Sequence, residues 1–393
     1  SGGIHIHEPG LLEAARQAAA SGRLTVDCCP SPADAFIIAV PTPFHEHDQG
    51  DYHGLPYRLA DMTAVSSATA AIVPYLCPGN LVILESTSPP RTTLDLVAPI
   101  LERSGLQAGV DFHLAYSPER VLPGQILREL VENARVIGGV NAASAQAGRD
   151  LYAIFVRGEI LLTDATTAEM VKLMENTYRD VNIAIANEFS RLAERFGVDV
   201  WQAIRFANRH PRVKILNPGP GVGGHCISVD PWFFVEKAPE LARLIHTARL
   251  VNDGQPQHSL ELVTRALGGD LRGKRIAALG LAFKPDVDDL RESPAIEVAQ
   301  LLAQAGALLR AYEPYKPAAQ IPGLETVPSL AAALEGADLI LLLVSHAEFT
   351  ALDPLQVARL TPARLVLDTR GVWDPAAWRA AGFTLHRLGD GRQ

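Results

Sequence analysis

The chain has 393 residues, of which 48% are hydrophobic and 20% charged, and its formal net charge is −9. This length suffices for two or three domains, and the composition is that of a globular protein rather than a disordered or collagen-like one. The acidic balance argues against a nucleic-acid partner or an anionic membrane surface, because both require an excess of Lys and Arg.

The first part of the chain alternates short apolar runs with helical patterns. Runs at 36–40, 81–84 and 112–116 predict strands, and residues 61–76 and 92–103 predict helices between them. Strands separated by crossover helices predict a parallel α/β sheet with both faces covered.

The pattern then becomes helical. Residues 166–196 predict one long helix, with Thr166 and Glu169 spaced as a capping box at its start. Further helices are predicted at 200–207 and, after a Pro- and Gly-rich stretch, at about 239–252.

Strands and helices alternate again in the last third of the chain. Residues 275–279, 308–312, 338–344 and 365–368 predict strands, and residues 294–305 predict a helix. The expected fold class is therefore α/β, with two Rossmann-like parallel-sheet domains joined by a central helical domain.

A dinucleotide-binding sheet ordinarily opens with a strand, a Gly-rich turn and a helix. No such unit is apparent before Asp34, so we expect the first domain to be N-terminally truncated. The string 219–224 has the G-x-G-x-x-G spacing, but it follows a Pro turn and is not expected to lead directly into a helix. The expected domains are residues 1–162, 163–266 and 267–393.

Cysteine usage and apolar runs bear on the compartment. Four cysteines are too few for a disulfide framework in this chain, and none has the spacing of a metal-ligand pair. The longest aliphatic runs are far shorter than the ~20 residues that a membrane span needs. We therefore expect a cytoplasmic protein with no membrane partner and no bound metal.

Cys226 ends a glycine-dense loop and precedes Asp230 by four residues. A thiolate nucleophile needs access and a backbone that lets a substrate approach, and glycines allow that approach. An isolated cysteine is more often buried and inert, but the loop and the nearby carboxylate favour a nucleophile here. The other cysteines, Cys28, Cys29 and Cys77, lack this context and are expected to be structural.

Several basic side chains could meet an anion. Lys172, Asn176 and Arg179 share one face of the long helix, at i, i+4 and i+7, where an ammonium and an amide would suit a developing alkoxide. His210 and Arg212 lie in a basic loop just before the glycine-dense loop. A solvated surface is the alternative explanation for either group.

The segment 280–291 follows a predicted strand of the last domain, where an open parallel sheet binds its ligands. Lys284 and Arg291 in this segment could each meet a phosphate. Arg370 follows the strand predicted at 365–368, and is therefore expected at the same edge of the sheet.

Together these motifs resemble the UDP-glucose/UDP-N-acetylmannosamine 6-dehydrogenase family, over essentially the whole chain. The resemblance implies an NAD-binding domain, a central helix that forms a homodimer, and a C-terminal domain that binds the UDP part of the substrate. It also implies oxidation of a sugar C6 alcohol to a carboxylate, with two NAD and a covalent Cys intermediate, for bacterial surface polysaccharide synthesis. The matching blocks are 40–43, 85–89, 118–124, 168–187, 209–231 and 280–294.

The resemblance also implies roles for individual residues. Cys226 would be the nucleophile, Lys172 the cation at the reacting oxygen with Asn176 beside it, Asp230 the carboxylate that assists water or proton transfer, and Glu119 a neighbour of the catalytic water. The residues matched to the cofactor are Thr42, Thr87 and Arg291. The residues matched to the UDP-sugar are Arg120, Val121, Lys172, Asn176, Arg179, His210, Arg212, Gly223, Phe283, Lys284 and Arg370.

Arg179, His210 and Arg212 resemble the version of the family that acts on 2-acetamido sugars, which implies UDP-N-acetyl-D-mannosamine as substrate. UDP-N-acetylglucosamine and UDP-glucose are alternatives, as is a UDP-sugar-binding protein that is inactive because it lacks the NAD fingerprint. The chain departs from the family pattern at Arg91, where a Gly is usual, and at Ser228, where Pro or Ala is usual.

Overall fold

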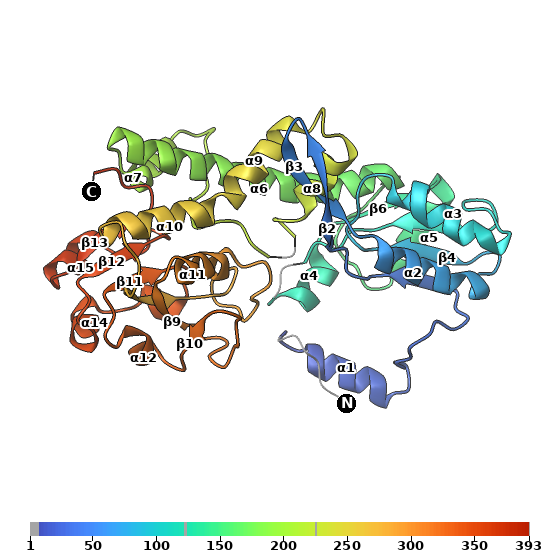
Figure 1. The fold of residues 1–393 in the computed structure, drawn as a ribbon. Coiled ribbons are helices and arrows are strands. Elements are labelled where there is room, and N and C mark those ends of the chain that lie inside the picture. The colour runs from blue at the N-terminus through green and yellow to red at the C-terminus, as the bar shows by residue number, and fades with distance from the viewer. Residues whose placement is uncertain (1–7, 122–123, 225, 393) are drawn as a thin grey trace. The chain divides into compact units, whose positions relative to one another are not determined.

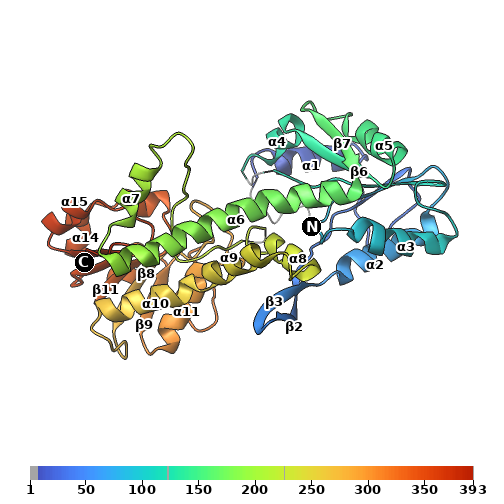
Figure 2. The ribbon, with the colours of Figure 1, turned by 90° about the horizontal axis from the view of Figure 1, so that it is seen from above.

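The computed structural model describes residues 8–121, 124–224 and 226–392 (Figure 1). The chain divides into two compact units. The first holds the chain up to Glu175 together with Trp232–Ala242, and the second holds Asn176–Pro231 and Arg243–Gln393. The boundary at Glu175 falls inside α6 (Ala165–Phe196), which Figure 2 shows as one continuous helix.

The sheet of the first unit has five strands in the order β1-β4-β5-β6-β7. Strands β1, β4 and β5 are parallel to one another, but β6 pairs antiparallel with β5. Since β6 and β7 are again parallel, the first sheet is mainly parallel, as expected, with one antiparallel pair where β6 meets β5. The strands are β1 (Ala35–Ile38), β4 (Leu81–Leu84), β5 (His113–Tyr116), β6 (Arg135–Gly139) and β7 (Ile160–Asp164).

Helical segments cover both faces of this sheet. Along β4, Val82 and Leu84 pack into one buried cluster, and the alternating Leu81 and Ile83 pack into another. This alternation is the two-residue period of a strand buried on both sides. The helical segments in this part of the chain, not all of which cover the sheet, are α1 (Leu11–Ala20), α2 (Thr63–Ile72), η1 (Val73–Tyr75), η2 (Thr93–Val97), α3 (Ala98–Leu101), η3 (Glu102–Ser104), α4 (Ile126–Glu132) and α5 (Ala142–Tyr152).

Helices α4 and α5 and strands β6 and β7 were not predicted, and two further features of the first unit were not anticipated. The antiparallel hairpin β2 (Phe44–Tyr52) and β3 (Leu55–Ala60) is polar and lacks an apolar run. It contacts α8 (Asp230–Lys237) through an edge-to-face pair of Phe44 and Phe233. Before β1, α1 is a helix in the stretch before Asp34, where we expected the opening strand, Gly-rich turn and helix to be missing, and residues 1–7 of that stretch lie outside the described residues.

The expected capping box at the start of α6 was also wrong. Asp164 caps the helix instead, because its carboxylate accepts the N–H of Thr167 at 2.9 Å and the Thr167 hydroxyl at 2.6 Å. Glu169 is fully buried, and its carboxylate accepts hydrogen bonds from the segment that begins η2. The Glu169 side chain, which the local sequence pattern assigned to the N-terminus of α6, thus makes tertiary hydrogen bonds instead.

The sheet of the second unit has six strands, all parallel, in the order β10-β9-β8-β11-β12-β13. This arrangement confirms the α/β prediction for the last third of the chain. The strands are β8 (Arg275–Leu279), β9 (Leu308–Tyr312), β10 (Glu325–Thr326), β11 (Leu339–Leu342), β12 (Leu365–Asp368) and β13 (Thr384–Arg387).

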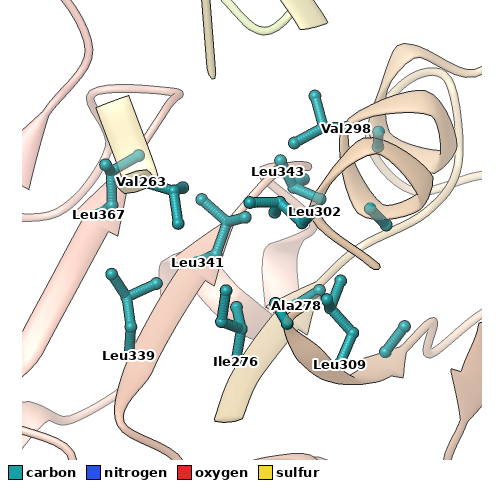
Figure 3. Packing of buried hydrophobic residues seen from close by; sticks show 14 of the residues in the cluster. Val263, Ile276, Ala278, Val298, Leu302, Leu309, Leu339, Leu341, Leu343 and Leu367 are labelled. Atoms are coloured by element: carbon teal, nitrogen blue, oxygen red, sulfur yellow. The ribbon is translucent and has the colours of Figure 1, made fainter. Parts of the chain in front are cut away.

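Two buried clusters lie on opposite faces of this sheet. In one, Ile276 and Ala278 pack with Leu341 and with Val298 of α11 (Figure 3). In the other, the alternating strand residues pack against Trp378 and its neighbours. The helices of the second unit are α7 (Val200–Ala207), α9 (Arg243–Asp253), α10 (Gln255–Ala266), α11 (Pro294–Gln304), α12 (Leu330–Leu334), α13 (Ala347–Thr350), α14 (Pro354–Leu360) and α15 (Pro375–Ala380). Within the described residues, no helix has both the length and the apolarity needed to span a bilayer.

Candidate functional site

The carboxyl edge of the first sheet brings Thr42 and Thr87 together. Thr42 follows β1 and Thr87 follows β4, and these two strands are parallel neighbours. The Thr42 hydroxyl donates to the carbonyl of Thr87 at 2.8 Å. Both residues were predicted to contact the cofactor, and they lie at the edge where an open parallel sheet binds a nucleotide.

Glu169 braces the backbone that continues from this edge. Its Oε2 accepts the N–H of Arg91 at 2.6 Å, and its Oε1 accepts the N–H and the hydroxyl of Thr93 at 2.8 and 2.7 Å. Burial raises the pKa of Glu169, and these hydrogen bonds only partly oppose that effect. Arg91 has φ of 74°, a left-handed conformation that favours glycine, so the departure noted at this position falls on a strained residue.

Glu119 belongs to a charged cluster around the buried Arg135. The Arg135 guanidinium donates to Glu119 Oε2 at 2.8 Å and to Glu85 Oε1 at 3.2 Å. The Tyr152 hydroxyl bonds to the same carboxylate of Glu85, and burial is the largest cause of the raised pKa of Tyr152. Arg135 therefore holds in place the glutamate that the family pattern assigns to the catalytic water.

Arg120, a predicted substrate contact, is paired within the first unit. Its Nη2 lies 2.5 Å from Glu175 Oε1, and its Nε donates to Glu175 Oε2 at 3.1 Å. Val121 follows it and is half-buried, as is Lys172 on α6. A phosphate meeting Arg120 would have to compete with this two-point ion pair.

In the second unit, Cys226 leads into a turn that ends at Asp230. The N–H groups of Val229 and Asp230 both donate to the carbonyl of Cys226, at 3.0 and 2.9 Å. Asp230 is 2% exposed, and its Oδ2 accepts the amide of Asn176 at 2.5 Å. The structure therefore joins two of the residues predicted to be catalytic and ties the carboxylate to the thiol through the backbone.

The glycine loop before Cys226 packs tightly on two predicted substrate contacts. A Cβ at Gly219 would lie 2.4 Å from Nη1 of Arg370, and one at Gly223 would lie 2.3 Å from a backbone oxygen. Gly224 has φ of 88°, and a Cβ there would lie 2.7 Å from the Phe283 ring. Glycines are required here because another chain segment occupies the space that a side chain would take.

Buried amides fix the same loop from its other side. Asn187 of α6 accepts the N–H of Gly219 at 2.9 Å, and Gln255 of α10 donates to its carbonyl at 2.8 Å. Asn187 in turn donates to Asn252 at 2.9 Å. Asn187 lies in a matching block of the sequence but had no predicted role, and neither Asn252 nor Gln255 has a local sequence signal.

Arg370 is held by the end of β12. The carboxylate of the buried Asp368 accepts the N–H groups of Arg370 and Gly371, each at 2.8 Å, and that of Trp373 at 2.9 Å. Burial lowers the pKa of Arg370, and the nearby Asp368 charge opposes that shift. The turn thus places a desolvated guanidinium beside the glycine loop.

The remaining cations of the second unit are more open. Lys284 lies over the ring of Phe283, with its Nζ 5.6 Å from the ring centre. Arg291 makes a two-point ion pair with Asp289, in which Nη2 lies 2.6 Å from Oδ2. The hydrogen bonds to Asp289 are the main cause of the raised pKa of Arg291, and the nearby Cys226 contributes least. Arg291, predicted to contact the cofactor, therefore lies within electrostatic range of the predicted nucleophile.

The three residues predicted to recognise a 2-acetamido sugar are exposed. Arg179 lies on α6, about one helical turn after Asn176. His210 and Arg212 follow α7. Asn208 holds this loop, because its side chain bonds to both the N–H and the carbonyl of Ile215. The structure does not assign these side chains a ligand, so their role stays a prediction.

Three domain models of one family match the chain in order. They are the NAD binding domain of the UDP-glucose/GDP-mannose dehydrogenase family at residues 1–156, its central domain at 166–254, and its UDP binding domain at 277–375. The first match includes the stretch before Asp34, where no opening strand and Gly-rich turn was apparent in the sequence.

Curated relatives match over nearly the whole chain. A UDP-N-acetyl-D-mannosamine dehydrogenase of Methanocaldococcus jannaschii is 46% identical over 98% of this chain and 86% of its own length. One of Yersinia pestis is 48% identical over 95% and 89%. An NDP-N-acetyl-D-galactosaminuronic acid dehydrogenase of Ralstonia solanacearum is 49% identical over 94% and 86%.

Solved structures show the same fold. That of a UDP-D-ManNAc dehydrogenase from Pyrococcus horikoshii has a TM-score of 0.88 and 39% identity, covering 100% of this chain and 90% of its own. That of a UDP-glucose dehydrogenase from Pyrobaculum islandicum has a TM-score of 0.81 and 29% identity, covering 99% and 88%.

Proposed function

The chain belongs to the UDP-glucose/GDP-mannose dehydrogenase family, and on that premise we propose that it oxidises C6 of UDP-N-acetyl-D-mannosamine to the carboxylate. It is an NAD-dependent oxidoreductase that acts on a UDP-sugar. The identity of the sugar, the covalent cysteine intermediate and the roles of the individual residues are parts of the proposal. A role in bacterial surface polysaccharide synthesis is part of the same proposal.

The first unit suits a dinucleotide. Thr42 and Thr87 lie at the carboxyl edge of neighbouring parallel strands, and Glu169 keeps the following backbone in a fixed shape. We assign Thr42 and Thr87 to the cofactor. Arg291, which the resemblance also matches to the cofactor, belongs to the second unit. NAD, when bound, supplies the hydride acceptor for each of the two oxidations.

The first oxidation converts the C6 alcohol to an aldehyde. The hydroxyl loses its proton to a base or to water, and C6 loses a hydride, so two electrons leave the sugar. The charge that develops on the oxygen needs a fixed cation, and we assign this task to Lys172, with Asn176 beside it. Glu119, held by Arg135, orients water.

The second oxidation requires a covalent step, because an aldehyde carbonyl must gain a nucleophile before it can lose a hydride. The Cys226 thiolate adds to the carbonyl carbon, and the oxygen takes a proton to give a thiohemiacetal. Loss of a second hydride and of the hydroxyl proton leaves a thioester. Water then attacks the thioester, releases the carboxylate and restores the thiol, with Asp230 assisting proton transfer.

The observation that carries this proposal is the turn from Cys226 to Asp230. The backbone bonds to the Cys226 carbonyl and the bond from Asn176 to Asp230 hold the thiol-bearing residue and a buried carboxylate in one rigid turn. A cysteine with no chemical function would need neither glycines that let a substrate approach its thiol nor a buried carboxylate nearby.

The same proposal includes a homodimer through the central helix. Large apolar side chains on α6 are exposed at spacings of mostly three and four residues, the period of a helix that packs lengthwise on a partner. Tyr178 is 69% exposed and Phe196 is 73% exposed. The members of this stripe are Met170, Met174, Tyr178, Ile185, Phe189, Leu192 and Phe196.

Exchange of Cys226 for Ser tests the covalent mechanism. The variant should form no carboxylate, because a serine hydroxyl is a far poorer nucleophile at neutral pH. The measurement is NADH formed per UDP-N-acetyl-D-mannosamine, with Cys77→Ser, at an exposed cysteine, as control. A yield of two NADH at the normal rate in Cys226→Ser would refute the mechanism.

A substrate panel tests the sugar. Because the Ralstonia relative is an NDP-N-acetyl-D-galactosaminuronic acid dehydrogenase, the panel includes an N-acetylgalactosamine nucleotide beside UDP-N-acetylglucosamine and UDP-glucose. We expect the highest kcat/KM for UDP-N-acetyl-D-mannosamine. A higher value for another sugar would transfer the assignment to it.

A further inference from the structure

A buried pair of ionisable side chains in the second unit has no part in the proposed chemistry. His346 is 0% exposed and Glu313 is 2% exposed, and His346 Nε2 lies 3.0 Å from Glu313 Oε2. Glu313 follows β9 and His346 follows β11, and these strands flank β8 on its two sides. The pair therefore spans the carboxyl edge of the central strand.

The hydrogen bonds determine the state of the pair. The N–H of Asp286 donates to His346 Nδ1 at 2.9 Å, so Nδ1 is an acceptor and the ring proton lies on Nε2, which donates to Glu313. Burial acts to raise the pKa of Glu313, but the bonds from His346 and from backbone N–H groups outweigh it, and the pKa lies below its usual value. The imidazole thus lies between one backbone donor and one carboxylate acceptor.

The pair grips the segment 281–286 at both ends. Glu313 Oε2 accepts the N–H groups of Leu281 and Ala282 at 2.7 and 2.9 Å, and His346 holds the N–H of Asp286. Asp286 has φ of 60°, a conformation that a non-glycine residue rarely keeps without support.

The gripped segment carries two of the predicted UDP-sugar contacts. Phe283 and Lys284 lie between the two anchored ends, and the Phe283 ring fills the space beside Gly224. The position of Phe283 therefore affects both the nucleotide side of the site and the backbone two residues before Cys226.

We propose that Glu313 and His346 are positioning residues for the UDP-binding segment, which they hold at Leu281, Ala282 and Asp286 so that Phe283 and Lys284 meet the nucleotide. The inference rests on the proposed function only in taking UDP as the ligand. Neither side chain is a catalytic residue, since each acts through the backbone it holds.

Three substitutions of His346 separate the two bonds. His346→Phe keeps an aromatic ring in the same space but removes both nitrogens. An amide group in His346→Asn lies at the level of Nδ1 and can still accept from Asp286, while one in His346→Gln lies at the level of Nε2 and can still donate to Glu313. We expect His346→Phe to weaken UDP binding roughly 5- to 150-fold, and His346→Asn and His346→Gln each to restore part of the loss.

UDP binding is measured by calorimetry on the full chain, and amide hydrogen exchange at Asp286 is followed in parallel. The matched control is His258→Phe, which removes a second imidazole of the second unit, one that is 11% exposed and paired with Glu194 at 3.1 Å. This control should lower the melting temperature to a similar extent and leave the UDP dissociation constant unchanged, while NAD binding stays unchanged in all variants.

The inference fails if His346→Phe binds UDP within twofold of the wild type, or if His258→Phe weakens UDP binding equally, because the loss would then follow stability. Unchanged exchange at Asp286 in His346→Phe would also overturn it. A wild-type chain that bound UDP but oxidised no UDP-sugar would contradict the proposed function and leave this inference standing.

Discussion

Glu169 in the first unit and Glu313 in the second are similarly buried, and each accepts two backbone N–H groups from a segment that follows a strand of its sheet. Their pKa values nevertheless shift in opposite directions. Burial raises the pKa of Glu169, whereas at Glu313 the hydrogen bonds from His346 and from backbone N–H groups outweigh burial and lower the pKa. The partner of a buried carboxylate, rather than its burial alone, decides which protonation state the fold favours.

The parallel extends to backbone strain. In each unit, a residue held by the network has a positive φ, Arg91 at 74° and Asp286 at 60°. The side chain of Asp286 adds to its own support, because its carboxylate accepts the Ala347 N–H at 2.8 Å and the Tyr315 hydroxyl at 3.0 Å. The Arg91 side chain instead pairs with Asp95 at the surface. The positive φ of Asp286 is thus supported in part by its own carboxylate, whereas that of Arg91 is supported by the carboxylate of Glu169.

Removing either glutamate should have the largest effect. Glu169→Ala and Glu313→Ala each leave buried N–H donors without an acceptor, so each should lower the free energy of unfolding of its own unit by about 2–5 kcal/mol. Urea denaturation, followed with NAD or UDP present to mark the two units, measures the change. The exposed Glu132 and Glu335 are the matched control sites, and their Ala variants should change little. Losses as small as those of the controls would show that neither glutamate braces its unit.

The pH dependence of stability should distinguish the two glutamates by sign. The folded-state pKa of Glu169 lies above the ordinary value of 4.5, so its contribution is fully present below that pH and is lost as pH rises through the folded pKa. The folded-state pKa of Glu313 lies below 4.5, so its contribution is present above that pH and is lost as pH falls through the folded pKa.

The measurement compares the free energy of unfolding of the wild type with that of Glu169→Gln and of Glu313→Gln from about pH 3 to 7, because the change at Glu313 lies below its ordinary pKa. The advantage of the wild type should shrink with rising pH for Glu169 and grow for Glu313. Slopes of the same sign would contradict the opposite shifts.

Glycine at the two strained positions should have the smallest effects, and these should again differ in sign. Arg91→Gly relieves a left-handed conformation and loses only a surface ion pair, so it should raise the melting temperature slightly. Asp286→Gly also relieves strain but removes two hydrogen bonds, and should lower the free energy of unfolding by about 1–2 kcal/mol. Thermal unfolding of both variants is the test, and stabilisation by both would show that the Asp286 side chain contributes nothing.

The local sequence pattern was enough to predict the helices and strands that carry a clear hydrophobic periodicity. The long helical pattern predicted α6, and the apolar runs predicted β1, β4, β5, β8, β9, β11 and β12, whereas β6, although buried throughout, was not predicted. The glycines before Cys226 and the carboxylate after it were readable as a site because all of them lie within one short stretch. The polar hairpin β2–β3 had no such signal, since its strands lack the apolar alternation on which prediction depends.

Tertiary structure alone decided the partners of the buried polar groups. Glu169 fitted a capping box by spacing, yet its carboxylate bonds to residues more than 70 positions away in the chain. Glu313 and His346 stand 33 residues apart and meet only because parallel strands bring their carboxyl ends to one edge of the sheet. Hydrophobic periodicity reports which face of an element is buried, but a buried polar group takes whichever donor the packed chain places beside it, and that choice is made only when the elements assemble.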